Sequence, residues 1–190
     1  MDGQAPLRGA SAAARGYLLA AAAVALRFEI PLDDIVERAA ALNPVARRGE
    51  IVRTRDIAII DDTYNSNPGA VARVLEMVAG ETRYGRRIAV LGEMLELGEA
   101  GPSLHRTAGE QAARSGVSAV VAIGGPNARE LANGALAGGM SADSVHYVED
   151  SRKGADIVTS LVKPGDLVLV KGSRGIRTEV VVDRRKAGGA

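Results

Sequence analysis

A dense group of polar side chains directly follows an apolar run in the stretch IAIIDDTYNSNPG, residues 57–69. The group consists of Asp61, Asp62, Tyr64, Asn65 and Asn67. Carboxylate and amide groups at a strand end can bind ribose hydroxyls or a metal-bound water, and a tyrosine ring can lie against a base. The residues fit a second interpretation equally well, in which the asparagines only cap the next helix and the acids are solvated.

A second candidate site is the stretch KGSRG, residues 171–175, which follows the last apolar run of the chain. Its functional groups are two cations and a hydroxyl, on Lys171, Arg174 and Ser173. This set predicts an anion site, because the neighbouring glycines let backbone N–H groups approach an oxyanion. The alternative is a basic, solvated turn. No GxxxxGK motif followed by Ser or Thr occurs in the chain, so it has no P-loop of its own.

Two further segments could contribute to a site. The run Arg47-Arg48-Gly49-Glu50 could swing an arginine toward a phosphate, or it could simply be exposed. The stretch LGEMLELGE, residues 91–99, is a glycine-bracketed loop with three carboxylates. It could form a substrate wall or an ordinary acidic surface loop.

Short apolar runs alternate with helical patterns along most of the chain. The predicted strands are 51–53, 57–60, 87–91, 119–123, 145–148 and 167–170. The predicted helices between them are 68–78, 103–114, 127–137 and 151–161. Continuous apolar runs are typical of strands covered on both faces, so this order predicts an α/β fold with a doubly wound, mostly parallel six-stranded sheet. Ligands bind such sheets beyond the carboxyl ends of the strands, where both candidate sites lie.

The N-terminal part of the chain has a different pattern. Residues 1–10 are rich in Gly, Ala and Pro and are predicted to be disordered, and two helices are predicted at 11–27 and from about 31 to 42. The apolar run YLLAAAAVAL, residues 17–26, is too short to span a bilayer and lacks a following cleavage site. A short helical segment that packs on a neighbour is therefore expected before the sheet.

Composition excludes several classes of function. The 190 residues carry a net charge of +1, which gives no reason to expect nucleic acid or an anionic membrane as partner. The chain has no cysteine, which excludes disulfides and thiolate chemistry and fits a cytoplasmic protein. His105 and His146 lack metal-ligand spacing, so no metal site is predicted; His105 is expected at the surface or in a helix cap.

Taken in order, four segments resemble one family, the Mur ligases, in their C-terminal domain. They are Arg48-Gly49-Glu50, IIDDTYNSNP at 59–68, RRIAVLGEMLELGE at 86–99 and DLVLVKGSRG at 166–175. The resemblance covers about residues 17–185, and its strongest similarity is to the branch that adds D-alanyl-D-alanine to UDP-N-acetylmuramoyl-tripeptide. It implies a Rossmann-like C-terminal domain at 48–186, preceded at 11–47 by the helical tail of a central ATPase domain.

The resemblance also implies roles for the candidate residues in ATP-dependent amide formation through an acyl phosphate. Arg48 would reach the ATP phosphates and act in catalysis. The nucleotide-binding residues would be Asp62 (or, less well matched, Asp61), Tyr64, Asn65 and Asn67. The carboxylate of the incoming dipeptide would be held by Lys171, Ser173 and Arg174. ATP and Mg²⁺ are expected only together with the central domain.

Several family features do not occur in this sequence. The P-loop, the magnesium-binding residues and the UDP-binding domain have no counterpart, and the stretch 13–17 lacks the His-Asn-x-x-Asn pattern of the family. We therefore expect a truncated ligase, inactive without the missing ligase domains as partners. The alternative is a stand-alone module that binds a nucleotide or a dipeptide without catalysis. A third hypothesis is a flavodoxin-like fold with unrelated chemistry, which the scarcity of aromatic residues disfavours.

Overall fold

A computed structural model describes residues 12–42 and 46–188 of the chain. The chain divides into two compact units, Met1–Val45 and Ala46–Ala190. Within the described ranges, no helix combines the length and apolar character needed to cross a membrane. The predicted disorder of residues 1–10 lies outside these ranges.

The first unit contains the two predicted helices, α1 (Ala12–Arg27) and α2 (Leu32–Ala40). Asp33 and Asp34 lie in the first turn of α2, where carboxylates interact favourably with the positive end of the helix dipole. No residue of α2 is buried. Large apolar side chains are exposed on both helices or between them, among them Tyr17, Leu19, Val24, Phe28, Leu32 and Val36. In the described part of this unit, these side chains are therefore not buried between the two helices.

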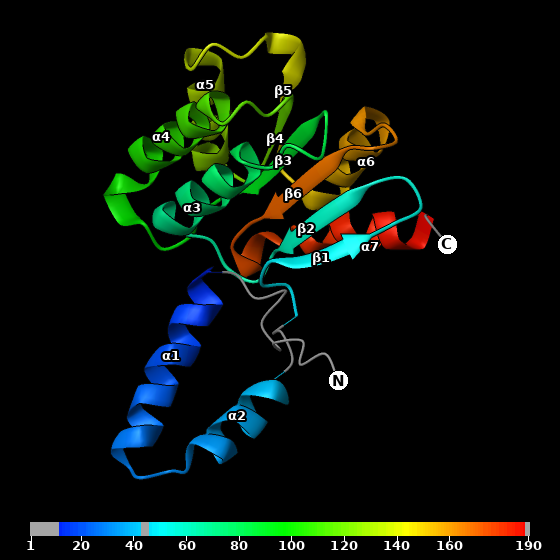
Figure 1. The fold of residues 1–190 in the computed structure, drawn as a ribbon. Coiled ribbons are helices and arrows are strands. Elements are labelled where there is room, and N and C mark those ends of the chain that lie inside the picture. Colours follow the sequence, from blue (N-terminus) through cyan, green and yellow to red (C-terminus); the bar gives the residue numbers. More distant parts are fainter. Residues whose placement is uncertain (1–11, 43–45, 189–190) are drawn as a thin grey trace. The chain divides into compact units, whose positions relative to one another are not determined.

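The second unit is built on a six-stranded sheet in the order β1-β2-β6-β3-β4-β5 (Figure 1). The strands are β1 (Glu50–Arg53), β2 (Ala58–Asp62), β3 (Arg87–Gly92), β4 (Ala119–Ile123), β5 (Val145–Val148) and β6 (Leu167–Lys171). Only β1 runs antiparallel to its neighbour, and every other pair is parallel. The predicted Rossmann-like, mostly parallel six-stranded sheet is confirmed.

Helices cover both faces of the sheet. The helices α3 (Pro68–Ala79), α4 (Gly101–Arg114) and α5 (Pro126–Ala137) pack on one face, and α6 (Ser151–Leu161) and α7 (Glu179–Gly188) pack on the other. Alternate residues of β2 point into the two cores. Ile60 packs on the side of α3, α4 and α5, and Ile59 packs on the side of α6 and α7. The sequence did not predict α7, because its three consecutive valines are typical of a strand rather than a helix.

The order of the strands predicts a crevice on each side of β6. The chain passes from β2 through β3 and β4 to β5 by way of α3, α4 and α5, and α6 then returns it to insert β6 between β2 and β3. After β2 and β3 the chain turns to one face of the sheet, and after β6 it turns to the other. Ligands of open α/β sheets bind where neighbouring connections diverge in this way. The end of β6 is therefore the position at which a site is expected.

Candidate functional site

The two aspartates at the end of β2 have different environments. Asp61 is buried, and its Oδ1 accepts hydrogen bonds from the backbone N–H of Thr63 at 3.3 Å and from the Thr63 hydroxyl at 2.6 Å. This carboxylate therefore holds the turn that follows the strand. Asp62 is partly exposed, and its Oδ2 lies 2.7 Å from Lys171 Nζ at the end of β6. Of the two acids, Asp62 is therefore the one whose carboxylate is accessible to solvent.

The Lys171 ammonium lies inside this junction rather than at its surface. Its side chain is 3% exposed, and besides Asp62 it donates to the backbone carbonyl of Asn65 at 2.8 Å. The sequence predicts Lys171 as a ligand of a substrate carboxylate. That role stays a prediction, and the geometry shows that two protein oxygens already bind the ammonium.

Tyr64 lies beside two arginines from distant parts of the chain. The guanidinium carbon of Arg48 lies 4.1 Å from the centroid of the Tyr64 ring, and that of Arg174 lies 5.6 Å from it. Cations at these distances are attracted by the ring quadrupole. The structure thus brings together one predicted catalytic residue, one predicted nucleotide-binding residue and one predicted substrate-binding residue.

A pocket of about 280 Å³ opens next to this stack. Its lining residues are Arg47, Thr63, Tyr64, Arg174 and Glu179. The pocket combines two guanidinium groups, an aromatic ring, a threonine and one carboxylate. Such a lining suits a ligand that carries negative charge and a planar group.

Arg47 and α7 hold the chain where it approaches this pocket. Arg47 was predicted only as part of a run that could swing an arginine toward a phosphate, and α7 was not predicted. The Arg47 guanidinium lies 3.5 Å from Glu179 and 3.4 Å from Asp183, which both belong to α7. The carbonyl of Arg47 accepts a hydrogen bond from the backbone N–H of Tyr64 at 3.1 Å. Because α7 was not expected as a helix, these partners could not be identified from the sequence.

The two asparagines of the DDTYNSNP segment differ in what they bind. Asn67 is the N-cap of α3, since its Oδ1 accepts from the backbone N–H of Ala70 at 2.9 Å. Asn65 Oδ1 accepts from the backbone N–H of Ser66 at 2.8 Å, while the residue itself is exposed. The capping interpretation is therefore correct for Asn67, and a nucleotide contact by either residue stays a prediction.

Ser173 and His105 together position the loop that follows β3. The Ser173 Oγ accepts the backbone N–H of Leu95 at 3.0 Å, and His105 Nε2 accepts that of Met94 at 2.8 Å. Since Nε2 is an acceptor, Nδ1 carries the proton and donates to the Gly101 carbonyl at 2.6 Å. His105 is 0% exposed, so its expected place at the surface was wrong.

The carboxylate of Glu93 binds the turn after β4. Its Oε2 accepts the backbone N–H of Gly125 at 2.5 Å, and its Oε1 accepts from Asn127 Nδ2 at 2.9 Å. Gly125 is the N-cap of α5, so Glu93 lies where a phosphate lies in many glycine-rich strand-to-helix turns. Glu93 is therefore not a solvated surface acid, and a role of the loop as a substrate wall stays a prediction.

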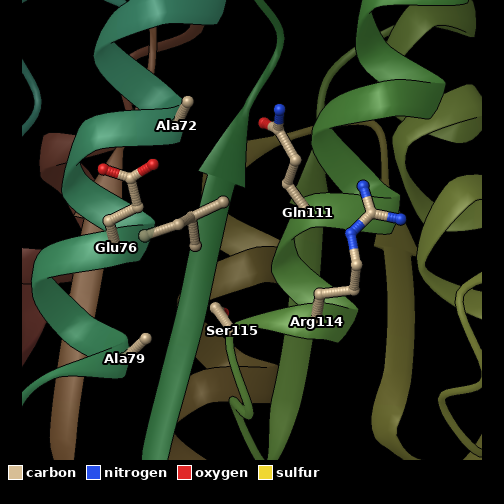
Figure 2. Close-up of a pocket in the computed structure, with 7 residues that line it drawn as sticks. Ala72, Glu76, Ala79, Gln111, Arg114 and Ser115 are labelled. Atoms are coloured by element: carbon tan, nitrogen blue, oxygen red, sulfur yellow. The ribbon is translucent and has the colours of Figure 1, made fainter.

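A second pocket, of about 240 Å³, lies between α3 and α4 (Figure 2). It is lined by Ala72, Leu75, Glu76, Ala79, Gln111, Arg114 and Ser115. These residues lie toward the C-terminal ends of the two helices, away from the strand ends described above, and include no predicted site residue. Among the residues that the structure describes, no three His, Cys, Asp or Glu side chains cluster as metal ligands would.

Known proteins match this chain over most of its length. The sequence matches the family described as "Mur ligase, glutamate ligase domain" over residues 47–174. It is 33% identical, over 87% of this chain, to the UDP-N-acetylmuramoyl-tripeptide--D-alanyl-D-alanine ligase of Mycobacterium leprae, and 29% identical, over 86%, to that of Bacillus subtilis. The aligned part makes up 35% and 36% of those two proteins, so the chain spans little more than a third of their length.

Solved structures give the same result. The MurF ligase from Thermotoga maritima in complex with ADP aligns with 87% of this chain and 36% of its own, at a TM-score of 0.68 and 28% identity. MurF from Acinetobacter baumannii aligns with 89% of this chain and 36% of its own, at a TM-score of 0.71 and 26% identity. The match over residues 47–174 covers more than half of the chain, and the chain therefore belongs to the Mur ligase family.

Proposed function

We propose that this chain supplies the C-terminal domain of an ATP-dependent ligase that joins D-alanyl-D-alanine to UDP-N-acetylmuramoyl-tripeptide in peptidoglycan synthesis. The relatives described above carry that activity in their names. The observation that carries the proposal is the stack of Tyr64 with Arg48 and Arg174 at the crevice beside β6. It joins an aromatic surface to guanidinium groups, which suit the base and the phosphates of a nucleotide.

The proposed nucleotide contacts are those groups that the fold leaves accessible. The Tyr64 ring is 37% exposed, and Arg48, Asn65 and Asn67 are exposed. Arg48 would bind phosphate oxygens, and the amide of Asn65 and the carboxylate of Asp62 would bind polar groups of the nucleoside. Asp61 would act indirectly, because its carboxylate holds the turn. Bound ATP would supply the phosphoryl group that activates the tripeptide carboxylate.

The proposed site for the dipeptide is the other side of the same crevice. Arg174 is exposed at the first position after Ser173, and its fork of N–H donors fits a carboxylate. The Ser173 hydroxyl, which already accepts from Leu95, retains a proton to donate. Glu179 lines the pocket beside Arg174 and could pair with the ammonium of the dipeptide. The pocket would thus match the two charges of a zwitterion.

The remaining parts of the reaction are assigned to ligase segments other than these 190 residues. A transferred phosphoryl group needs a cradle and Mg²⁺, and the sequence contains no P-loop motif. The exposed apolar side chains of α1 and α2 support the proposal that these helices pack on a central ATPase domain. A complete ligase would carry out this reaction in the cytoplasm, where ATP is available.

The proposal is tested by joining this chain to the first two thirds of the Bacillus subtilis relative and measuring product from tripeptide, D-alanyl-D-alanine and ATP. We expect the fusion to form product and the 190-residue chain alone to form none. A properly folded fusion without any product would contradict the proposal. Calorimetry on the chain alone covers the alternative: binding of ATP or D-alanyl-D-alanine without other domains would favour a stand-alone binding module.

A further inference from the structure

The Lys171 ammonium is the most deeply buried cation at the ligand-facing edge of the sheet. Its side chain is 3% exposed, whereas the neighbouring Arg174 is exposed. Its two oxygen partners lie at 2.7 Å, on Asp62, and at 2.8 Å, on the carbonyl of Asn65. A lysine that binds a substrate carboxylate must offer its N–H groups to the ligand. The Lys171 ammonium instead donates hydrogen bonds to oxygens of the protein itself.

These two partners link three parts of the chain. In the sheet, Lys171 of β6 lies directly beside Asp62 of β2. Asn65 lies three residues further on, in the turn between β2 and α3. A single ammonium thus ties the end of one strand to both the end of its neighbour and the turn that follows it. Because buried charges are costly unless paired, removal of either charge should loosen this junction.

Tyr64 lies between the two residues that the ammonium binds. Its backbone N–H bonds to the linker at the Arg47 carbonyl, and its ring contacts Arg48 and Arg174. The position of the ring is therefore set by a short backbone segment that Lys171 holds at both ends. Displacement of this segment would separate the two guanidinium groups from their shared aromatic surface.

We infer that Lys171 is a positioning residue, which holds the segment from Asp62 to Asn65 and with it the Tyr64 ring that Arg48 and Arg174 contact. It neutralises Asp62 and does not bind the carboxylate of the incoming dipeptide. The part of the inference that concerns ligands rests on the proposed function. The part that concerns the buried ammonium depends only on this chain.

The structural part is tested by NMR on the 190-residue chain near neutral pH. Ammonium protons of exposed lysines exchange rapidly with water, so we expect a protected ammonium signal from Lys171 and none from Lys153, which is 71% exposed. Asp62→Asn should speed the exchange of the Lys171 signal. If the ammonium protons of Lys171 in the wild-type chain exchange with water as fast as those of Lys153, the inference is overturned.

A matched pair of substitutions tests the tether itself. Lys171→Met should raise the exchange of the backbone amides of Thr63, Tyr64 and Ser66 by at least about tenfold, because one partner of a buried ion pair is lost. Lys153→Met should leave them unchanged. Unchanged amide exchange in a folded Lys171→Met chain would contradict the tethering role.

The kinetic part uses the fusion with the Bacillus subtilis relative. With Lys171→Met, we expect the KM for ATP to rise by about tenfold, and by a larger factor than the KM for D-alanyl-D-alanine, which also rises because Arg174 contacts the same ring. With Arg174→Gln, the KM for the dipeptide should rise. A selective rise in the dipeptide KM for Lys171→Met would show that the lysine is a substrate ligand. If the unmodified fusion is inactive, the proposed function fails, while the NMR result still decides the role of the ammonium.

Discussion

Two strand-to-helix turns at the same edge of the sheet use their polar groups in opposite ways. After β2, Asn67 caps α3 from within the turn, and Tyr64 remains exposed beside Arg48. After β4, the turn has no side-chain cap of its own, and Glu93 of the neighbouring loop binds Gly125 N–H instead. The first turn leaves functional groups free for a ligand, whereas the second is closed by the carboxylate of the protein.

The comparison shows that a glycine-rich turn is not by itself a phosphate site. Gly124 has φ of +141°, and a Cβ on it would lie 2.6 Å from Glu93 Cβ. The glycine is therefore needed so that Glu93 can approach the start of α5. At the β2 turn Asn67 caps α3 from within the turn, and two arginines lie beside Tyr64.

The largest effect is expected for a methyl group added to the closed turn. Gly124→Ala should lower the free energy of unfolding by about 3 kcal/mol, because it combines an unfavourable φ with a clash against Glu93. The matched change next to the open turn is Gly69→Ala, at the second residue of α3, where the nearest atom is a flexible Arg73 nitrogen at 3.5 Å. Urea unfolding should find that variant within about 1 kcal/mol of wild type. Equal losses would show that the two turns do not differ.

Removal of the closing carboxylate should have a smaller but still large effect. Glu93→Ala leaves the partly buried N–H of Gly125 and the amide of Asn127 without their acceptor, and we expect a loss of about 2–3 kcal/mol in urea unfolding. Glu99→Ala, at an exposed position of the same loop, is the control and should stay within about 0.5 kcal/mol. A negligible loss for Glu93→Ala would mean that the turn is not held by this carboxylate.

Loss of the local cap in the open turn should be milder. Asn67→Ala removes the acceptor for Ala70 N–H at the exposed start of α3, which should cost about 1 kcal/mol in unfolding free energy. Asn67→Asp keeps an acceptor at this position and should recover most of the loss. A loss as large as that of Glu93→Ala would contradict the difference between the two turns.

A third turn, after β5, provides the smallest expected effect. The pKa of Asp150 is held below its usual value, chiefly because the backbone N–H of Lys153 donates to its carboxylate. Since the folded pKa is depressed, this stabilisation is present above the unfolded pKa and is lost as the pH falls through the folded pKa. Wild type should therefore be slightly more stable than Asp150→Ala at pH 6, and the difference should shrink as the pH falls below about 4. A difference that does not depend on pH would contradict the assignment.

Local sequence signals were sufficient to predict most of the fold. Four of the six strands, β2, β3, β4 and β6, contain continuous apolar runs of the kind covered on both faces, and the Asn67-Pro68 pair marked the start of α3. The missed helix α7 has three β-branched residues near its start, and it is helical because Val181 and Val182 pack against the sheet. Tertiary packing overrode the local preference there.

The site was harder to predict because its contacts join distant segments. Tyr64 and Arg174 could each be identified by residue type, but their stack depends on which face of the sheet the chain turns to after β6. Neither Glu93 nor His105 carried a local signal, because their partners come from other turns of the fold. A buried lysine such as Lys171 looks the same in sequence as an exposed one.

The most direct test of the account compares two arginine–tyrosine stacks at this edge of the sheet. Tyr64 lies 4.1 Å from Arg48 in the open turn, and Tyr147 lies 4.9 Å from Arg129 near the closed one. In the active fusion, Tyr64→Leu should raise the KM for ATP by about tenfold, and Tyr147→Leu should change it by less than about twofold. An unchanged KM for ATP in Tyr64→Leu, or an equal rise in both variants, would contradict the proposal that the β2 turn forms part of the nucleotide-binding site.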